Sequence, residues 1–161
     1  MAAELFAFSV PFRDLAPVVD GWRERTCATK PSHGVPPHVT LLVPAPPDVE
    51  GAAEAFAPFG EFEVVFPRVG RFPGTLWLAP EPSEPFVAMT KSLLVRFPEH
   101  APYGGEFEAI TPHLTVAQGD ELAEAESALE PLLPLRSRAS SVVLFEQVAP
   151  DRWRENAELP L

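Results

Sequence analysis

Hydrophobic and polar positions follow two different periods along the chain, and the two periods alternate. Apolar or alternating runs that are typical of strands occupy residues 4–11, 38–44, 61–69, 75–79, 113–118 and 140–149. Apolar residues recur at helical spacing in residues 13–26, 48–59, 83–97 and 120–133. We expect the final residues, 151–161, to return along 140–149 as a hairpin. The mixture predicts an α+β fold with antiparallel sheets and flanking helices.

Three of the predicted helices begin beside residues that can cap them. Asp48, Ser83 and Asp120 stand at the start of their helical patterns. A short side-chain oxygen at this place can accept a hydrogen bond from a free backbone N–H of the first turn. We therefore expect all three residues to act as N-caps.

The order of predicted elements occurs twice. Each time, a helix and a loop lead to a Pro-His-x-Thr strand, which is followed by an acid-capped helix, a long strand and a shorter strand with a tryptophan. His38 lies 39 residues before Trp77, and His113 lies 40 residues before Trp153. Duplication at a fixed spacing indicates two similar structural units.

The repeat also predicts the domain organisation. A chain of 161 residues suits one compact domain or two small lobes that share a core. We interpret residues 1–161 as one bilobal domain whose repeat halves span approximately 1–80 and 81–161. The two lobes are expected to be related by a pseudo-twofold axis, with their sheets adjacent and a central cleft between them.

The duplicated Pro-His-x-Thr segments carry the candidate chemistry. Side chains at positions i and i+2 of a strand share a face, so His38 and Thr40 point the same way, as do His113 and Thr115. A neutral imidazole can take a proton from a nucleophile, and an imidazolium can give one to a leaving group. Threonine hydroxyls can donate to the non-bridging oxygens of a phosphoryl group. Two such pairs, brought together, suit a phosphodiester and require no metal.

A structural interpretation competes with this chemistry. A single histidine on a strand usually makes one structural hydrogen bond, and threonine is common in strands. One His-x-Thr therefore carries little information. Two copies, both after a proline and both at the same point of a repeat, favour a functional site at His38 and His113.

The remaining histidines and the cysteine point to no second site. His33 and His100 fall in predicted loops, where solvated histidines are common. Cys27 is the single cysteine, so an intramolecular disulfide and a cysteine-based metal cage are excluded. The sequence contains no HExxH, no G-x-G-x-x-G and no Walker A segment. We predict neither a metal nor a cofactor.

Several other side chains could line a ligand site. The aromatic candidates for stacking on a base are Phe6, Phe8, Phe72, Trp77, Tyr103 and Trp153. Arg68 and Arg71, near the predicted hairpin, could pair with a phosphate. Aromatic residues more often belong to the core, and arginines are common on surfaces.

The charge of the chain limits the size of an anionic partner. The sequence has 12 Lys and Arg against 23 Asp and Glu, a net charge of −11. Such a surface repels an extended phosphate backbone, although a short nucleotide or RNA end can still enter a local pocket. No apolar run reaches the roughly 20 residues that span a bilayer, so no membrane partner is expected. The N-terminus lacks a basic leader, and we expect a cytoplasmic monomer.

The two motifs resemble those of a known family. The segments PHVTLL (37–42) and PHLTVA (112–117) are similar to the paired H-x-T/S signatures of the 2H phosphoesterase superfamily, which includes the 2′-5′ RNA ligase and cyclic phosphodiesterase group. The resemblance implies a bilobal α+β fold with a central cleft. It implies that the protein hydrolyses 2′,3′-cyclic phosphates of nucleotides or RNA ends. It also implies that His38 and His113 are the acid/base pair and that Thr40 and Thr115 hold the phosphate.

The family pattern leaves several questions of function open. By analogy His113 would activate water and His38 would protonate the leaving oxygen, although pseudo-symmetry makes these roles easy to exchange. Some relatives carry a basic residue just after the second motif, where Gln118 stands here. The alternatives to hydrolysis are 2′-5′ RNA ligation at the same site and a non-catalytic module that binds a nucleotide or phosphate.

Overall fold

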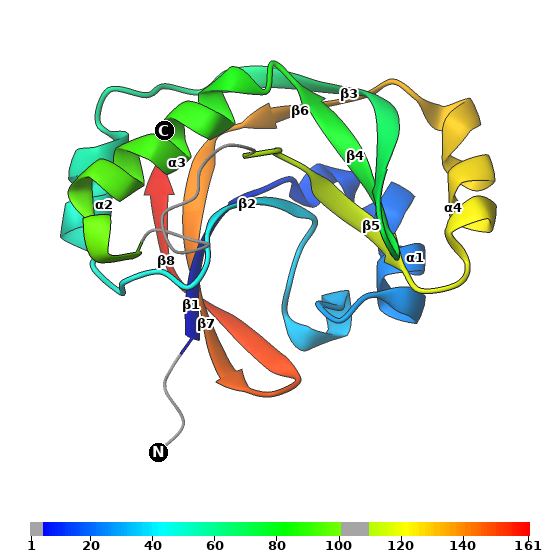
Figure 1. The fold of residues 1–161 in the computed structure, drawn as a ribbon, viewed down its shortest axis with the longest axis horizontal. Coiled ribbons are helices and arrows are strands. Elements are labelled where there is room, and N and C mark those ends of the chain that lie inside the picture. The colour runs from blue at the N-terminus through cyan, green and yellow to red at the C-terminus, as the bar shows by residue number, and fades with distance from the viewer. Residues whose placement is uncertain (1–4, 101–109) are drawn as a thin grey trace.

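A curled antiparallel sheet forms the centre of the computed structural model, which describes residues 5–100 and 110–161 (Figure 1). Within this part of the chain the sheet has eight strands: β1 (Leu5–Pro11), β2 (His38–Leu42), β3 (Phe62–Phe72), β4 (Thr75–Glu81), β5 (Leu114–Gln118), β6 (Leu135–Ala139), β7 (Ser141–Ala149) and β8 (Arg152–Pro160). The helices are α1 (Ala16–Thr26), α2 (Val49–Phe56), α3 (Glu84–Arg96) and α4 (Leu122–Leu129). Short 3-10 turns occupy 13–15, 31–33, 98–100 and 130–132. The α+β fold predicted from the sequence is confirmed.

The two motif strands lie side by side at the middle of the sheet. The strand order is β6-β3-β4-β5-β2-β1-β7-β8, and the central pair β5–β2 is joined through Leu114 and Val39. We call the line along which β5 and β2 pair the seam, and four strands lie on each side of it. The group β2-β1-β7-β8 joins strands from the two ends of the sequence, whereas the group β6-β3-β4-β5 comes from its middle.

The strand order changes the interpretation of the two tryptophans. Trp77 lies on β4, directly beside the motif strand β5, whereas Trp153 lies on β8 at the edge of the sheet. The matching distances from His38 to Trp77 and from His113 to Trp153 therefore do not mark equivalent positions. The expectation that the two tryptophan strands correspond was wrong.

Helices cover one face of the motif strands and anchor them. Helix α3 contacts β2, and α1 contacts β5, while α2 packs against α3 (Figure 1). The side chains of Val39, Leu41, Leu114 and Val116 are buried in the core beneath these helices. Thr90 on α3 donates its hydroxyl hydrogen to the Leu41 carbonyl oxygen over 2.8 Å, which ties α3 to β2. Because side chains alternate along a strand, the histidines and threonines of the motifs are left on the opposite face.

The predicted helix caps are confirmed at one of three positions. Asp48 is the N-cap of α2, and its carboxylate accepts a hydrogen bond from the Gly51 N–H over 2.9 Å. Ser83 is the N-cap of α3 by position but makes no side-chain hydrogen bond there. Asp120 is not a cap, because α4 begins one residue later and has Glu121 as its N-cap.

The sequence patterns missed one strand of the sheet. Strand β6, with the sequence LRSRA, pairs with β3 at the edge of the sheet. Its polar residues alternate in a segment too short to be told from a loop. None of the helices formed by the described residues is long and apolar enough to cross a membrane.

Candidate active site

The four motif side chains gather on one face of the central strand pair. Val39 lies opposite Leu114 in the antiparallel ladder between β2 and β5. Extending this register by one residue in each direction places His38 opposite Thr115 and Thr40 opposite His113. Residues that face one another in an antiparallel pair point to the same side, with Cβ atoms about 4.5–5.5 Å apart. The sheet therefore arranges each imidazole across from the hydroxyl of the other motif.

Backbone carbonyls fix both imidazole rings in the same way. Nδ1 of His38 lies 2.8 Å from the Pro36 carbonyl oxygen, and Nδ1 of His113 lies 2.7 Å from the Thr111 carbonyl oxygen. A carbonyl oxygen can only accept, so each Nδ1 is the protonated nitrogen that donates. Each Nε2 is then free to accept a proton when its ring is neutral, or to donate one when the ring is charged.

The environment of His38 favours a neutral ring. Burial is the largest cause that lowers the pKa of His38, to about 4 from an ordinary value of 6.5. The positive charges of Arg23 and His113 act in the same direction, while the hydrogen bond to the Pro36 carbonyl opposes them. At neutral pH His38 is therefore uncharged, with its lone pair on Nε2.

A small apolar cavity opens beside His38. It has a volume of about 120 Å³ and is lined by Ala7, Ser9, Thr29, Val35, His38, Thr40, Val43, Phe145 and Trp153. Strands β1 and β7 supply part of this lining because Ala7 pairs with Phe145 across their ladder. The loop before β2 closes one side, where a Cβ on Gly34 would lie only 2.3 Å from the Trp153 carbonyl oxygen. Gly34 also has a φ of +91°, so glycine is required for this approach.

Aromatic side chains flank His113 on the other side of the seam. The Phe72 ring meets the His113 ring edge to face at 5.0 Å, and the Trp77 ring lies 5.9 Å away. Phe72 is 37% exposed, so part of its ring is open to a ligand. Two of the six aromatic residues proposed from the sequence thus lie beside a motif histidine, and Trp153 lines the cavity beside the other.

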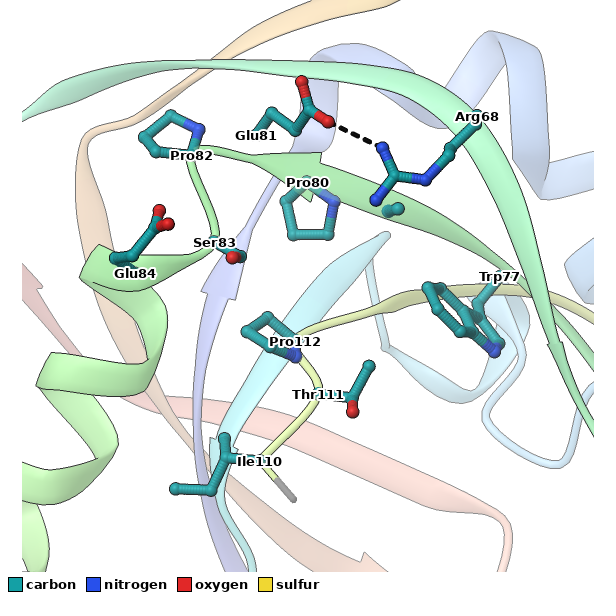
Figure 2. Close-up of a pocket in the computed structure, with 11 residues that line it drawn as sticks. Arg68, Trp77, Pro80, Glu81, Pro82, Ser83, Glu84, Ile110, Thr111 and Pro112 are labelled. Atoms are coloured by element: carbon teal, nitrogen blue, oxygen red, sulfur yellow. Dashed lines mark hydrogen bonds and ion pairs between the residues drawn. The ribbon is translucent and has the colours of Figure 1, made fainter. Parts of the chain in front are cut away.

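A larger cavity continues past Trp77. Its volume is about 550 Å³. Figure 2 shows Arg68, Trp77, Ser83, Thr111 and Pro112 around this space, contributed by β3, β4, the start of α3 and the segment that leads into β5. Thr111 and Pro112 belong to the segment that orients His113, so the cavity adjoins the His113 side of the motif strands.

The other sequence candidates lie away from the motif face or are engaged elsewhere. Phe6 and Phe8 belong to the core. Arg68 pairs with Glu81 across the β3–β4 hairpin, and Arg71 pairs with Glu126. His33 is absent from the lining of the cavity beside His38, and the His100 ring packs against Phe97. Tyr103 lies outside the described residues.

Cys27 and Gln118 have structural roles. Cys27 is buried, its thiol donates to the Val116 carbonyl oxygen over 3.4 Å, and burial raises its pKa. These features suit a core residue and not a nucleophile. The Gln118 side-chain oxygen accepts from the Ala28 N–H over 2.8 Å, so it ties β5 to the end of α1. Within the described residues, no group of three or more His, Cys, Asp or Glu side chains is placed to hold a metal ion.

Sequence reasoning missed most of the residues beside His38, and three of them are informative. Ser9 and Phe145 line its cavity, and Arg23 lies buried behind it. Ser9 could have been found from its alternation with Ala7 along β1, once that strand was known to neighbour β2. Arg23 gave no signal, because an arginine in a short amphipathic helix is usually a surface residue.

Comparison with known proteins supports the sequence resemblance. Residues 11–151 match the model of the 2′-5′ RNA ligase superfamily. Among curated protein sequences, none matches the chain significantly.

The fold resembles those of solved structures along almost the whole chain. Escherichia coli LigT complexed with 3′-AMP is 14% identical with a TM-score of 0.64, over 98% of each chain. LigT complexed with NADP+ is 17% identical with a TM-score of 0.61, over 100% of this chain and 99% of LigT. The protein TT0787 of Thermus thermophilus is 16% identical with a TM-score of 0.63, over 97% of each chain. Because the family model matches most of the length of this chain, the chain belongs to the 2′-5′ RNA ligase superfamily of 2H phosphoesterases.

Proposed function

We propose that the protein is a phosphodiesterase that hydrolyses the 2′,3′-cyclic phosphate of a nucleotide or a short RNA end. The observation that carries this proposal is the arrangement of His38, Thr40, His113 and Thr115 on one face of the β2–β5 pair. These side chains supply a base, an acid and two hydroxyl donors, which are the groups that hydrolysis of a phosphodiester requires. The proposed reaction is metal-independent because each of these tasks has a protein group to perform it.

In the proposed reaction, water attacks the phosphorus atom and one ester bond of the cyclic phosphate breaks. One imidazole takes a proton from the attacking water, and the other gives a proton to the departing ribose oxygen. The hydroxyls of Thr40 and Thr115 donate to the non-bridging oxygens and stabilise the charge that develops on them. The product is a phosphate monoester with one free ribose hydroxyl.

The electrostatics of His38 support a division of roles opposite to the family analogy. With a pKa of about 4, His38 is neutral before the substrate binds, so its Nε2 can accept a proton from water. His113 would then donate to the leaving oxygen from its own Nε2. Both rings are oriented for these tasks by the carbonyl oxygens that hold Nδ1.

Several observations support a small nucleotide as the substrate. The apolar cavity beside His38 and the Phe72–Trp77 pair beside His113 offer surfaces for a base or ribose. The solved LigT complexes hold 3′-AMP, ATP and NADP+, all of which are nucleotides. The net charge of −11 disfavours a long RNA strand.

The decisive test is turnover of 2′,3′-cyclic nucleotides by the purified protein in excess EDTA. We expect hydrolysis to a single monoester, and a loss of at least about 100-fold in kcat for His38→Ala and for His113→Ala. His33→Ala and His100→Ala are matched controls, because these histidines lie in other parts of the fold, and they should retain full activity.

Two results would redirect the proposal. Saturable nucleotide binding by a folded wild-type protein, without turnover, would instead indicate a binding module. Joined product from RNA ends that carry a 2′,3′-cyclic phosphate and a 5′-hydroxyl would indicate ligation at the same site.

A further inference from the structure

Arg23 is a buried cation with an unusual set of partners. It lies on α1 and is 1% exposed. One guanidinium nitrogen, Nη1, donates to the Asp20 carboxylate over 2.5 Å. The other, Nη2, lies within hydrogen-bond distance of the carbonyl oxygens of Thr29, Val35 and Pro36, at 3.2, 2.9 and 3.2 Å. A buried charge is stable only when it is paired in this way, so these contacts hold the α1–β2 loop closed around the guanidinium.

The Pro36 carbonyl connects Arg23 to the site. The same oxygen accepts a hydrogen bond from Nδ1 of His38 over 2.8 Å. A charged donor on a carbonyl fixes that carbonyl in place more firmly than a neutral donor does. The carbonyl in turn decides which nitrogen of His38 carries the proton and where the ring points. No arginine among the described residues has a matching bond to the Thr111 carbonyl, which orients His113.

We propose that Arg23 is a positioning residue for His38: through the Pro36 carbonyl it holds the imidazole in one tautomer and one orientation, with Nε2 free to act as the base. This inference rests on the proposed function of His38. The effect of Arg23 on the His38 ring can be tested separately from catalysis, because the tautomer and the orientation of the ring can be measured without a substrate.

The charge of Arg23 also contributes to keeping the ring neutral, in addition to the larger effect of burial. A charge on Arg23 from α1, or on His113 directly before β5, opposes protonation of His38. The side chains from β1, β7 and β8 that line the cavity with His38 are uncharged: Ala7, Ser9, Phe145 and Trp153. Removal of the Arg23 charge should therefore make His38 easier to protonate.

The test is an NMR titration of the His38 ring in the full-length protein and in Arg23→Gln, with no substrate present. In the wild type we expect a midpoint near pH 4 and a neutral ring protonated on Nδ1. In Arg23→Gln the midpoint should rise by only part of the interval to 6.5, because burial remains the largest cause of the low pKa, and the second tautomer should become populated. If the wild type turns over cyclic nucleotides, the variant should lose about tenfold in kcat with little change in KM. This magnitude is the lower end of the loss seen at metal sites when the outer hydrogen-bond partner of a ligand histidine is removed.

Arg23→Lys provides the matched comparison and covers the case in which Arg23→Gln does not fold. Lysine keeps the charge, but its single nitrogen cannot replace both the bond from Nη1 to Asp20 and the contacts of Nη2 with the carbonyl oxygens. In Arg23→Lys we expect the His38 ring to keep its low titration midpoint. We also expect the ring to populate both tautomers and kcat to fall. An unchanged midpoint in folded Arg23→Gln, or an unchanged tautomer ratio in Arg23→Lys, would overturn the proposal. Absence of turnover in the wild type would leave the titration results intact and count only against the proposed reaction.

Discussion

At the scale of single residues, the proposed catalysis depends on two hydroxyls as much as on two imidazoles. By extension of the Val39–Leu114 register, Thr40 lies across from His113 and Thr115 lies across from His38. In the proposed reaction each hydroxyl donates to a phosphoryl oxygen whose charge grows in the transition state. Removing one such donor costs about 100- to 1,000-fold in kcat at comparable sites.

Replacement of either threonine by valine should therefore lower kcat by about 100-fold, since valine has the same shape but no hydroxyl. Steady-state kinetics on a cyclic nucleotide would measure this loss. Thr40→Ser and Thr115→Ser serve as controls, because serine restores the donor and should recover most of the activity. Full activity in both valine variants would remove the threonines from the mechanism.

The low pKa of His38 has a consequence for stability. Its pKa is about 4 in the folded protein and about 6.5 in the unfolded chain. Between these values the unfolded chain binds a proton that the folded protein does not. Protonation of His38 therefore favours the unfolded chain in this interval. The free energy of unfolding is unaffected by His38 above pH 6.5 and decreases as the pH falls from 6.5 to 4.

Urea unfolding at several pH values between 7 and 4.5 would measure this effect. His38→Gln should reduce the dependence of the free energy of unfolding on pH in that interval. The carboxylates of Glu24, Glu146 and Glu158 have lowered pKa values, so their contributions are lost only below 4.5 and do not obscure the result. The same slope in wild type and variant would contradict the low pKa of His38.

At the scale of elements, much of the fold could be predicted where local patterns decide. The motif strands, helices α1 to α4 and the C-terminal hairpin follow from periodicity and from residues such as Asp48. Strand order could not be predicted in the same way, because it depends on pairing between residues distant in sequence. The mismatch between Trp77 and Trp153 is an example.

The contrast between Asp48 and Asp120 can be tested. Asp48→Ala removes the hydrogen bond to the Gly51 N–H and should destabilise the protein by about 1 kcal/mol. Asp120→Ala should change the free energy of unfolding by less than about 0.5 kcal/mol, since this residue lies outside the helix cap. Thermal or urea unfolding of the two variants would show whether α2 alone depends on its aspartate.

The β3–β4 hairpin positions an aromatic ring beside His113. A Cβ added at Gly70 would lie 2.4 Å from the Trp77 ring, so Gly70→Ala must displace the indole. We expect a destabilisation of about 1–3 kcal/mol from this overpacking and a raised KM for nucleotides. Gly60→Ala is the matched control, because a Cβ there meets nothing within 4 Å. Equal KM values in both variants would show that the Trp77 position does not affect binding.

At the scale of the whole molecule, the negative charge sets the response to salt. A chain of net charge −11 repels an anionic nucleotide, and added salt screens that repulsion. We expect kcat/KM for a cyclic mononucleotide to rise by about twofold between 20 and 200 mM NaCl. A steep fall over this range would instead indicate a basic groove that neutralises several phosphates.

The curled sheet brings together two motifs that lie far apart in the sequence, and the central claim is that they act on one phosphate. Groups that act as one catalytic unit are strongly non-additive: once one is lost, losing the other costs little more. The most direct test is kcat in EDTA for His38→Ala, His113→Ala and the double variant. We predict that the double variant is about as slow as either single one. Losses that multiply would contradict the claim and show that the two histidines act independently.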